Sequence, residues 1–434
     1  MLTPKVAWFT PWRAAVVIFL LSFFTRLAIY LLFAGPRPIP SDTELGRIAT
    51  EIGLHHQFAN PYKTPTGATA HAAPLYPLIQ CVWIALFGNT LTAGICAALV
   101  NIVFSSVASA LLPSLALQCG IPVSVGILAG LFQAAFPVSA LQELSFFDAT
   151  LVAMLLVVAS LVTIRIFTRS SYSVLSAFGY GMLWGLVLLA SPVTMTVFAG
   201  FLLVGFYFSF RRLRRSYGIF AGIALLSAFL TVLPWTIRNY FAFGEFFFIR
   251  DDFGLEMKIS NNSEASPLMD VNLTLPFYLE MHPSDSPEEA QVVREVGERE
   301  YNRRALHTAF EWIKGHPAQF LKLSFRRLTI FWFMLGWPPW KGVILVPMVL
   351  LAVAGCVRMV SRHPVAGWTI ASIPILFPPI YYIVQTSSRY RFPAYWTVSF
   401  LAFYALVTHF QPEGSRVAMA SGRVTDDTRP AKVP

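Results

Sequence analysis

Long apolar runs separated by short polar segments make up most of this chain. Apolar runs of roughly 17–25 residues are long enough to cross a membrane as helices. About ten such spans are expected, at about 12–34, 92–117, a run ending near 138, 148–165, 174–190, 193–210, 219–235, 343–357, a run ending near 384, and 392–410. The pattern therefore predicts an all-α polytopic membrane protein.

The first long polar interruption, residues 35–91, contains two further helical patterns. Apolar residues at i, i+3, i+4 and i+7 predict a short amphipathic helix that suits a membrane surface; they are Leu45, Ile48, Ala49 and Ile52. The apolar run at 75–87 is too short to cross a membrane comfortably, and we expect a juxtamembrane helix there.

Three polar residues at the start of the first of these helices have two interpretations. Ser41 and Glu44 match a capping box, and Asp42 suits the positive end of the helix dipole. Capping accounts for Ser41 and Glu44, but it leaves Asp42 less well explained because the cap is complete without it. The alternative is a carboxylate at an extracytoplasmic cavity, placed to take a proton from a hydroxyl group.

The second long polar segment, residues 238–341, is also expected to be largely helical. Ser286, followed by proline and two glutamates, predicts the start of a helix that runs to Lys314 and stops at Gly315. The next stretch, 318–340, is amphipathic and rich in aromatic residues. It is either an interfacial helix or an additional span, which would reverse the topology of everything after it.

The composition agrees with a membrane protein. Of the 434 residues, 56% are hydrophobic and only 12% are charged, which is about half the charged fraction of a soluble domain. The net charge of +10 comes from Lys and Arg in short loops, without the basic stripe of a nucleic-acid-binding protein. The four cysteines show no paired spacing, which argues against a disulfide framework or a zinc site.

Positive charge predicts the orientation in the membrane. The arginine-rich segment 211–215 is the strongest marker, and we expect it on the cytoplasmic side together with the N-terminus. This orientation makes the loops at 35–91 and 238–341 extracytoplasmic. Residues 1–410 are then one integral membrane domain, and 411–434 form a disordered cytoplasmic tail.

The outer ends of the spans collect nearly all the unusual polar residues, which are Glu143, Asp148, Arg238, Asn239, Arg389, Tyr390 and Arg391. The arginines either snorkel and form ion pairs that fix the bundle, or hold a phosphate while a carboxylate takes the acceptor's proton. Their place on the outer side runs against the positive-inside tendency and favours a functional role. His71 is either a loop histidine with its own partners or part of a substrate-binding loop.

An ordered set of motifs links these regions: the acidic motif at 41–44, TGATAHAAPLYP at 66–77, DATL at 148–151, PWTIRNYFAFG at 234–244, FGLE at 253–256 and RYRFP at 389–393. In this order, the motifs resemble those of bacterial membrane glycosyltransferases of the GT-C class. The similar group is glycosyltransferase family 39-like and includes protein O-mannosyltransferases and aminoarabinose transferases. The resemblance covers about residues 16–410.

The resemblance implies a GT-C-like fold and an inverting transfer of a sugar from a polyprenyl-phosphate donor to a lipid, glycan or protein. It places the active site on the outer face of the bacterial inner membrane and leaves open whether a divalent metal takes part. The acid after the first span would be the general base. Asp42 is favoured because Glu44 has the competing capping role, and Asp148 would match a second acid that binds substrate. A membrane transporter or lipid-linked sugar flippase is the alternative function.

Overall fold

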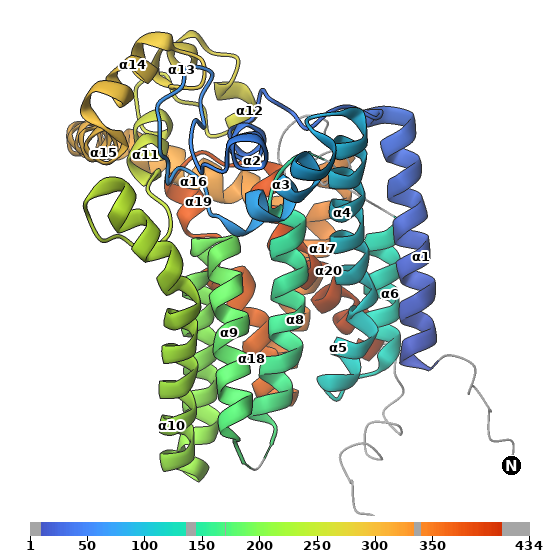
Figure 1. The fold of residues 1–434 in the computed structure, drawn as a ribbon. Helices are drawn as coiled ribbons and strands as arrows, with labels where there is room; N and C mark the ends of the chain where they lie inside the picture. Colours follow the sequence, from blue (N-terminus) through green and yellow to red (C-terminus); the bar gives the residue numbers. More distant parts are fainter. Residues whose placement is uncertain (1–9, 136–144, 170, 334–339, 410–434) are drawn as a thin grey trace, which may run out of the picture.

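The computed structural model describes residues 10–135, 145–169, 171–333 and 340–409, and within 211–215 and 340–341 it describes the backbone only. The fold of these ranges is all-α. Their β-type pairing is limited to two isolated bridges, Ala59 with Ala68 and Leu268 with Thr386. Figure 1 shows a bundle of long helices with a layer of shorter helices at one end. The tail predicted at 411–434 lies outside the described residues.

The bundle consists of apolar helices. They are α1 (Pro11–Ile29) with its π-helical extension η1 (Tyr30–Ala34), α4 (Leu91–Ala110), α5 (Leu112–Gln118), α6 (Val123–Ala135), α8 (Ala149–Phe167), α9 (Val174–Ala190), η2 (Pro192–Thr194), α10 (Met195–Phe243), α17 (Trp340–Arg362), α18 (Pro364–Leu376) and α20 (Ser388–His409). Seven helical segments of the described chain are long and apolar enough to cross a membrane, and α6 and α9 are shorter apolar helices. With α20, which is buried along most of its length, they account for the predicted spans. The predicted fold class is confirmed, and the chain is an integral membrane protein.

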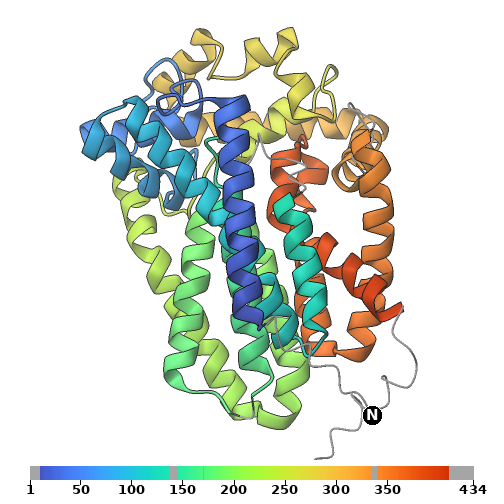
Figure 2. The same ribbon diagram turned by 90° about the vertical axis from the view of Figure 1, so that its right-hand side faces the viewer.

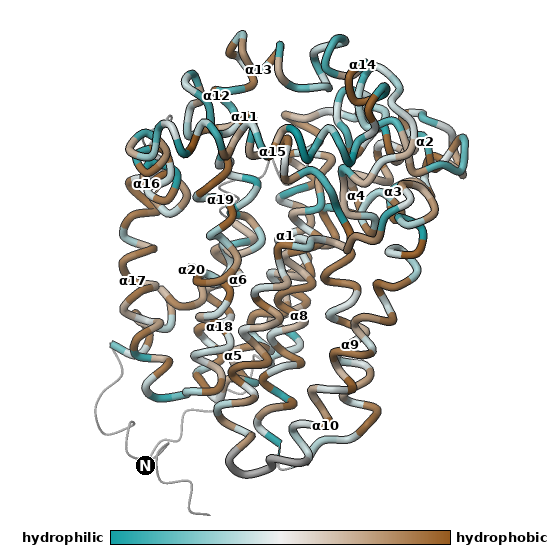
Figure 3. The backbone as a smooth tube through the Cα atoms, turned by 90° about the vertical axis from the view of Figure 1, so that its left-hand side faces the viewer, coloured by the Kyte–Doolittle hydropathy of each residue, from teal (hydrophilic) through white to brown (hydrophobic). Residues whose placement is uncertain are grey.

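The helix α10 doubles back on itself. The hydroxyl of Tyr217 donates a hydrogen bond to the carbonyl of Leu202, whereas a straight helix would separate these residues by about 22 Å. The two arms, Pro192–Phe210 and Ser216–Phe243, therefore correspond to the separate spans predicted at 193–210 and 219–235. The turn between them lies at the end of the bundle where the chain enters α1 (Figures 1 and 3), which agrees with the predicted topology.

The layer at the other end is more polar, as the hydropathy colouring in Figure 3 shows. Its helices are α2 (Glu44–His55), α3 (Leu75–Phe87), α11 (Phe253–Ser260), α12 (Met269–Asn272), α13 (Pro276–Met281), α14 (Pro287–Val296), α15 (Glu298–Gly315), α16 (Pro317–Phe333) and α19 (Ile380–Ile383). The juxtamembrane helix predicted at 75–87 is α3. The segment 318–340 was expected to be either an interfacial helix or an additional span. Its described part is α16, which lies across the end of the bundle (Figure 1) and is not among the candidate spans, so it agrees with an interfacial helix.

Two details of this layer differ from the sequence-based expectation. The helix expected from Ser286 to Lys314 is interrupted at Gly297, whose φ of +84° favours glycine and ends α14 before α15 begins. The N-cap of α2 also lies two residues later than predicted, at Thr43 instead of Ser41. Thr43 accepts a 3.2 Å hydrogen bond from the Gly46 amide, so the capping box of Ser41 and Glu44 is wrong and the Glu44 side chain is free for other contacts.

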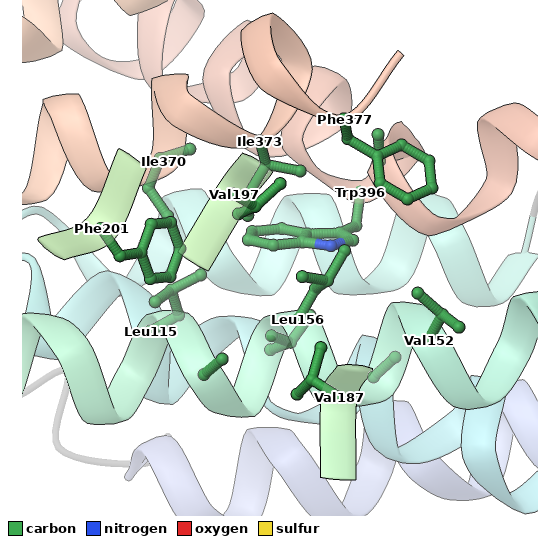
Figure 4. Packing of buried hydrophobic residues seen from close by; sticks show 14 of the residues in the cluster. Leu115, Val152, Leu156, Val187, Val197, Phe201, Ile370, Ile373, Phe377 and Trp396 are labelled. Atoms are coloured by element: carbon green, nitrogen blue, oxygen red, sulfur yellow. The ribbon is translucent and has the colours of Figure 1, made fainter. Parts of the chain in front are cut away.

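Close packing holds the bundle helices together. The ends of several of these helices form one wall of the site described below. Figure 4 shows Trp396 of α20 among Leu156 of α8, Val187 of α9 and Ile373 of α18, all of them no more than 2% exposed. Membrane helices associate through such packing, often with small residues at the contact. At Gly181, for example, an added Cβ would lie 2.1 Å from the carbonyl oxygen of Ala224 in α10.

Candidate active site

A cavity of about 540 Å³ lies where the polar layer meets the bundle. The polar layer contributes acidic, basic and aromatic side chains, which are Glu44, His71, Arg250, Asp252, Glu256, Tyr278 and His282. The bundle side is mostly apolar, with Phe147, Val152, Val193, Met195, Leu376, Phe377 and Ile380. Asp148, Arg389 and Tyr390 also line the cavity. Such a cavity suits a ligand that has both a charged part and a long apolar part.

Glu44 is a cavity carboxylate with a defined hydrogen bond. Its Oε1 accepts a 2.8 Å bond from the hydroxyl of Ser284. The Ser284 amide in turn donates 3.1 Å to Nδ1 of His282, so Nδ1 is an acceptor and the neutral ring carries its proton on Nε2. Burial raises the pKa of Glu44, whereas the hydrogen bond that the carboxylate accepts from the Ser284 hydroxyl lowers it, and the net pKa lies below its ordinary value. Glu44 is therefore an ionised carboxylate at neutral pH.

His71 stands beside Glu44 in the cavity wall and is fully enclosed. Its Nδ1 lies 3.3 Å from the hydroxyl of Tyr62, and its carbonyl accepts a 2.6 Å hydrogen bond from Nε of Arg250. Burial lowers the pKa of His71, which keeps the ring neutral. The sequence left two interpretations for this histidine; in the structure it both has its own partners and lines the cavity.

The loop that carries His71 is held by distant parts of the chain. Glu298 in α15 accepts a 2.5 Å hydrogen bond from the Thr69 hydroxyl and a 2.7 Å bond from the Ala70 amide. Arg238 at the end of α10 donates to the Thr69 carbonyl at 2.8 Å. Burial raises the pKa of Glu298 to about 8 despite these hydrogen bonds. These contacts fix the backbone from which His71 enters the cavity.

Arg250 is the centre of a group of charges that the sequence analysis did not identify. It forms an ion pair with Asp252. Burial lowers the pKa of Arg250, but Asp252, Glu256 and Asp148 raise it to a net value above normal, which shows that all three carboxylates lie near this guanidinium. Burial raises the pKa of Asp148, and Arg250 and Arg389 lower it. Asp148, Arg250 and Arg389 thus line the same cavity, and both arginines favour the charged form of Asp148.

Arg389 brings a second guanidinium into the cavity from the start of α20. Its guanidinium carbon lies 3.9 Å from the ring centroid of Phe147, and Nη2 donates a 2.9 Å bond to the Tyr390 hydroxyl. The Tyr390 ring stacks on Tyr381 at 4.6 Å. The Nε of Arg389 is buried without a hydrogen-bond partner among the described residues. Arg389 is thus oriented by aromatic contacts and keeps a donor for a ligand.

Several residues that the sequence analysis selected lie outside the cavity. Asp42 is exposed in the turn before α2 and does not line it. Asn239 is buried and donates to the Ile249 carbonyl at 3.3 Å, and Arg391 is buried and donates to the Phe331 carbonyl at 3.2 Å. Arg238 fastens the Thr69 loop, as described above, and Glu143 lies outside the described residues. Of the predicted set, the structure brings together Glu44, His71, Asp148, Arg389 and Tyr390.

The cavity residues that the sequence analysis missed come from two segments. The first is the run RDDFGLE at 250–256, which contains the FGLE motif named above but whose charged residues were not selected as site residues. Three acids and one arginine in seven residues are unusual in a chain with few charges, and that density is the available signal. The second segment holds Tyr278 and His282, whose rings stack at 4.9 Å. Nothing in the sequence near His282 indicates that it meets α2.

The described residues do not contain a group of three or more His, Cys, Asp or Glu side chains that could hold a metal ion. Among the cavity carboxylates, Asp252 pairs with Arg250 and Glu44 accepts a hydrogen bond from Ser284.

Comparisons with known proteins identify the fold. The sequence matches no family model, and no curated protein is similar to it. The crystal structure of the apo oligosaccharyltransferase of Archaeoglobus fulgidus matches with a TM-score of 0.58 at 13% identity, covering 96% of this chain and 52% of that chain. The same organism's AglB in complex with an inhibitory peptide and a dolichol-phosphate matches with a TM-score of 0.50 at 14% identity, covering 97% and 52%.

The chain thus spans about half the length of these oligosaccharyltransferases. ArnT from Cupriavidus metallidurans bound to undecaprenyl phosphate matches at 12% identity over 90% of this chain and 77% of that chain, but its TM-score of 0.39 is too low to support an argument. At these identities the similarity shows a shared fold. The chain therefore shares the fold of the Archaeoglobus fulgidus oligosaccharyltransferase, which agrees with the fold that the sequence resemblance implied.

Proposed function

We propose that this protein transfers a sugar from a polyprenyl-phosphate donor to an acceptor hydroxyl group. The observation that carries the proposal is one cavity that combines two arginines, an ionised carboxylate and an apolar wall made by membrane helices. These are the features needed for a phosphate, a proton acceptor and a prenyl chain. The AglB structure with the similar fold contains a dolichol-phosphate, which supports a lipid-linked donor here.

The donor phosphate lies between Arg389 and Arg250 in this proposal. Guanidinium groups bind phosphate through paired hydrogen bonds, and the unpartnered Nε of Arg389 supplies one of them. Arg250 forms an ion pair with Asp252. Burial raises the pKa of Asp252 to about 7, although Arg250 lowers it. Protonation of Asp252 leaves Arg250 available for the phosphate. The prenyl chain follows the apolar wall at the ends of α18 and α10.

Glu44 is the general base. The acceptor oxygen attacks the anomeric carbon from the side opposite the phosphate, and the bond between that carbon and the phosphate oxygen breaks with inversion. The acceptor proton passes to the Glu44 carboxylate, and polyprenyl phosphate leaves with the electron pair of the broken bond. The arginines stabilise the charge that develops on the phosphate.

The choice of Glu44 reverses the preference for Asp42 that the sequence suggested. That preference assumed that Glu44 was occupied by capping. In the structure Thr43 caps α2, and Glu44 points to Ser284 and lines the cavity, whereas Asp42 is exposed outside it. A proton acceptor must be within hydrogen-bond reach of the acceptor hydroxyl, and Glu44 is better placed for that.

The cavity faces the periplasm of a bacterial inner membrane in this proposal. The basic segment 211–215 and the start of α1 lie at the other end of the bundle, where the positive-inside rule puts the cytoplasm. Thiol labelling from outside tests this in a background without the four native cysteines. We expect Glu264→Cys to be labelled in intact cells and Ser171→Cys only after lysis; the reverse pattern would contradict the orientation.

An assay with labelled undecaprenyl-phosphate sugars tests the function itself. The purified protein is incubated with a panel of these donors and a total lipid and glycan extract as acceptor, and products are identified by mass spectrometry. We expect a new glycosidic bond and release of undecaprenyl phosphate. Movement of the intact donor across proteoliposomes without a new bond would instead support a transporter or lipid-linked sugar flippase.

A further inference from the structure

Glu256 is a cavity side chain for which the mechanism above has no use. It lies in the first helical turn of α11 and lines the cavity. Its Oε2 is buried and has no hydrogen-bond partner among the described residues. No ion pair within the described ranges includes it, although its neighbours pair: Asp252 with Arg250, and Lys258 with Glu289.

An unpartnered carboxylate oxygen in a protein interior costs about 1–3 kcal/mol or more. Such a group persists at a functional site because a ligand completes its hydrogen bonds. The ligand must donate protons, since an ionised carboxylate only accepts hydrogen bonds. The phosphodiester that links a sugar to a polyprenyl chain has no proton to donate at neutral pH. The hydroxyl groups of a sugar can donate.

The surroundings of Glu256 place it next to the phosphate end of the cavity. Burial lowers the pKa of Arg250. Asp252 raises it most, and the Glu256 carboxylate also raises it. The stacked rings of Tyr278 and His282 also line the cavity and offer a flat aromatic surface. A carboxylate beside an aromatic surface suits a sugar ring, which has polar hydroxyl edges and apolar C–H faces.

We propose that Glu256 recognises the sugar of the donor by accepting hydrogen bonds from its hydroxyl groups while the attached phosphate lies on the two arginines. This inference rests on the proposed function and adds a residue that determines specificity. Glu256 takes no part in the proton transfer. It distinguishes a donor that carries a polyhydroxyl sugar from the free lipid phosphate.

The test compares two ligands that differ only in the sugar. The first is undecaprenyl phosphate, and the second is whichever member of a panel of undecaprenyl-phosphate hexoses and pentoses binds the wild-type protein most tightly. Dissociation constants are measured in detergent for wild type, Glu256→Gln and Glu264→Gln. Glu264 is an exposed glutamate in the loop after α11 and provides the matched control.

We expect Glu256→Gln to weaken binding of the sugar-linked donor by about tenfold or more, as loss of a hydrogen bond to a charged group predicts. Binding of undecaprenyl phosphate should change by less than about twofold, and Glu264→Gln should change neither constant. Equal weakening of both ligands, or no loss of affinity for the sugar-linked donor, would overturn the inference. A wild-type protein that binds neither ligand would instead contradict the proposed function.

A second variant covers the case in which Glu256→Gln does not fold. Glu256→Asp keeps the charge and withdraws the carboxylate by one methylene group. It should weaken binding of the sugar-linked donor and leave binding of undecaprenyl phosphate unchanged. Retention of full affinity for the sugar-linked donor in this variant would count against Glu256.

Discussion

The hydroxyl of Ser284 donates a 2.8 Å hydrogen bond to Glu44 Oε1, across 240 residues of sequence. Within the polar layer, this bond joins the helix after the first span, α2, to the polar segment that follows the seventh predicted span. It also stabilises the charged form of Glu44, because a hydroxyl donates more strongly to a carboxylate than to a carboxylic acid. The two loops that form the cavity are therefore connected at the residue proposed as the base.

Removal of that hydroxyl should change the pH dependence of turnover. In Ser284→Ala, the pKa of Glu44 rises because its charged form loses a donor, and the acidic limb of the kcat profile moves to higher pH. Ser41→Ala, which alters an exposed serine outside the cavity, should leave the profile unchanged. An unshifted acidic limb in Ser284→Ala would contradict this role.

Arg389 and Arg391 should respond differently to the same substitution. Lysine keeps the charge but loses the forked geometry that binds phosphate. Arg389→Lys should weaken the binding of undecaprenyl phosphate by about tenfold. It should change thermal stability little, because the side chain lines the cavity. Arg391→Lys should mainly lower the melting temperature, since that guanidinium is buried against the Phe331 carbonyl and Tyr395. The opposite assignment of the two effects would refute the phosphate site.

Glu298 should make stability depend on pH. Its pKa is raised by burial from 4.5 to about 8, so the folded protein keeps a proton that the unfolded chain releases between these values. The stabilisation is complete below pH 4.5 and is lost as the pH rises through 8. Asp252, raised from 3.8 to about 7 by burial, acts in the same direction.

Melting temperatures in detergent between pH 5 and pH 9 measure this effect. Each retained proton changes the free energy of unfolding by up to about 1.4 kcal/mol per pH unit. Glu298→Gln removes the titration and should flatten the fall in melting temperature, and the exposed Glu264→Gln should not. A slope that is identical in wild type and Glu298→Gln would show that Glu298 titrates normally.

The sequence predicts the spans and the short helices well because their signals are local. The length of an apolar run determines whether a helix such as α8 can cross a membrane, and the turn residues around α3 lie next to it in the chain. The membrane orientation, which stays a prediction, also rests on a local signal, the charges at 211–215. These features need no knowledge of which residues meet in the fold.

The sequence predicts the site less well because its contacts are long-range. The pairing of Glu44 with Ser284 cannot be read from either segment. The predicted N-cap of α2 at Ser41, two residues before the observed N-cap at Thr43, led to the preference for Asp42. Arg238 resembled a ligand-binding arginine, but it holds backbone carbonyls of the Thr69 loop. An arginine at a membrane interface can serve either purpose, and only its partners distinguish the two.

The most direct test of the central claim is turnover of two matched variants, Glu44→Gln and Asp42→Asn, with the same undecaprenyl-phosphate sugar and acceptor. Each substitution removes a charge and keeps the shape of the side chain. Melting temperatures of both variants are measured alongside, to confirm folding. We predict that Glu44→Gln lowers kcat by about 100-fold or more, as expected for loss of a general base, while Asp42→Asn stays within about threefold of wild type. Near-normal turnover in folded Glu44→Gln, whether or not Asp42→Asn is active, would contradict the assignment of Glu44 as the base.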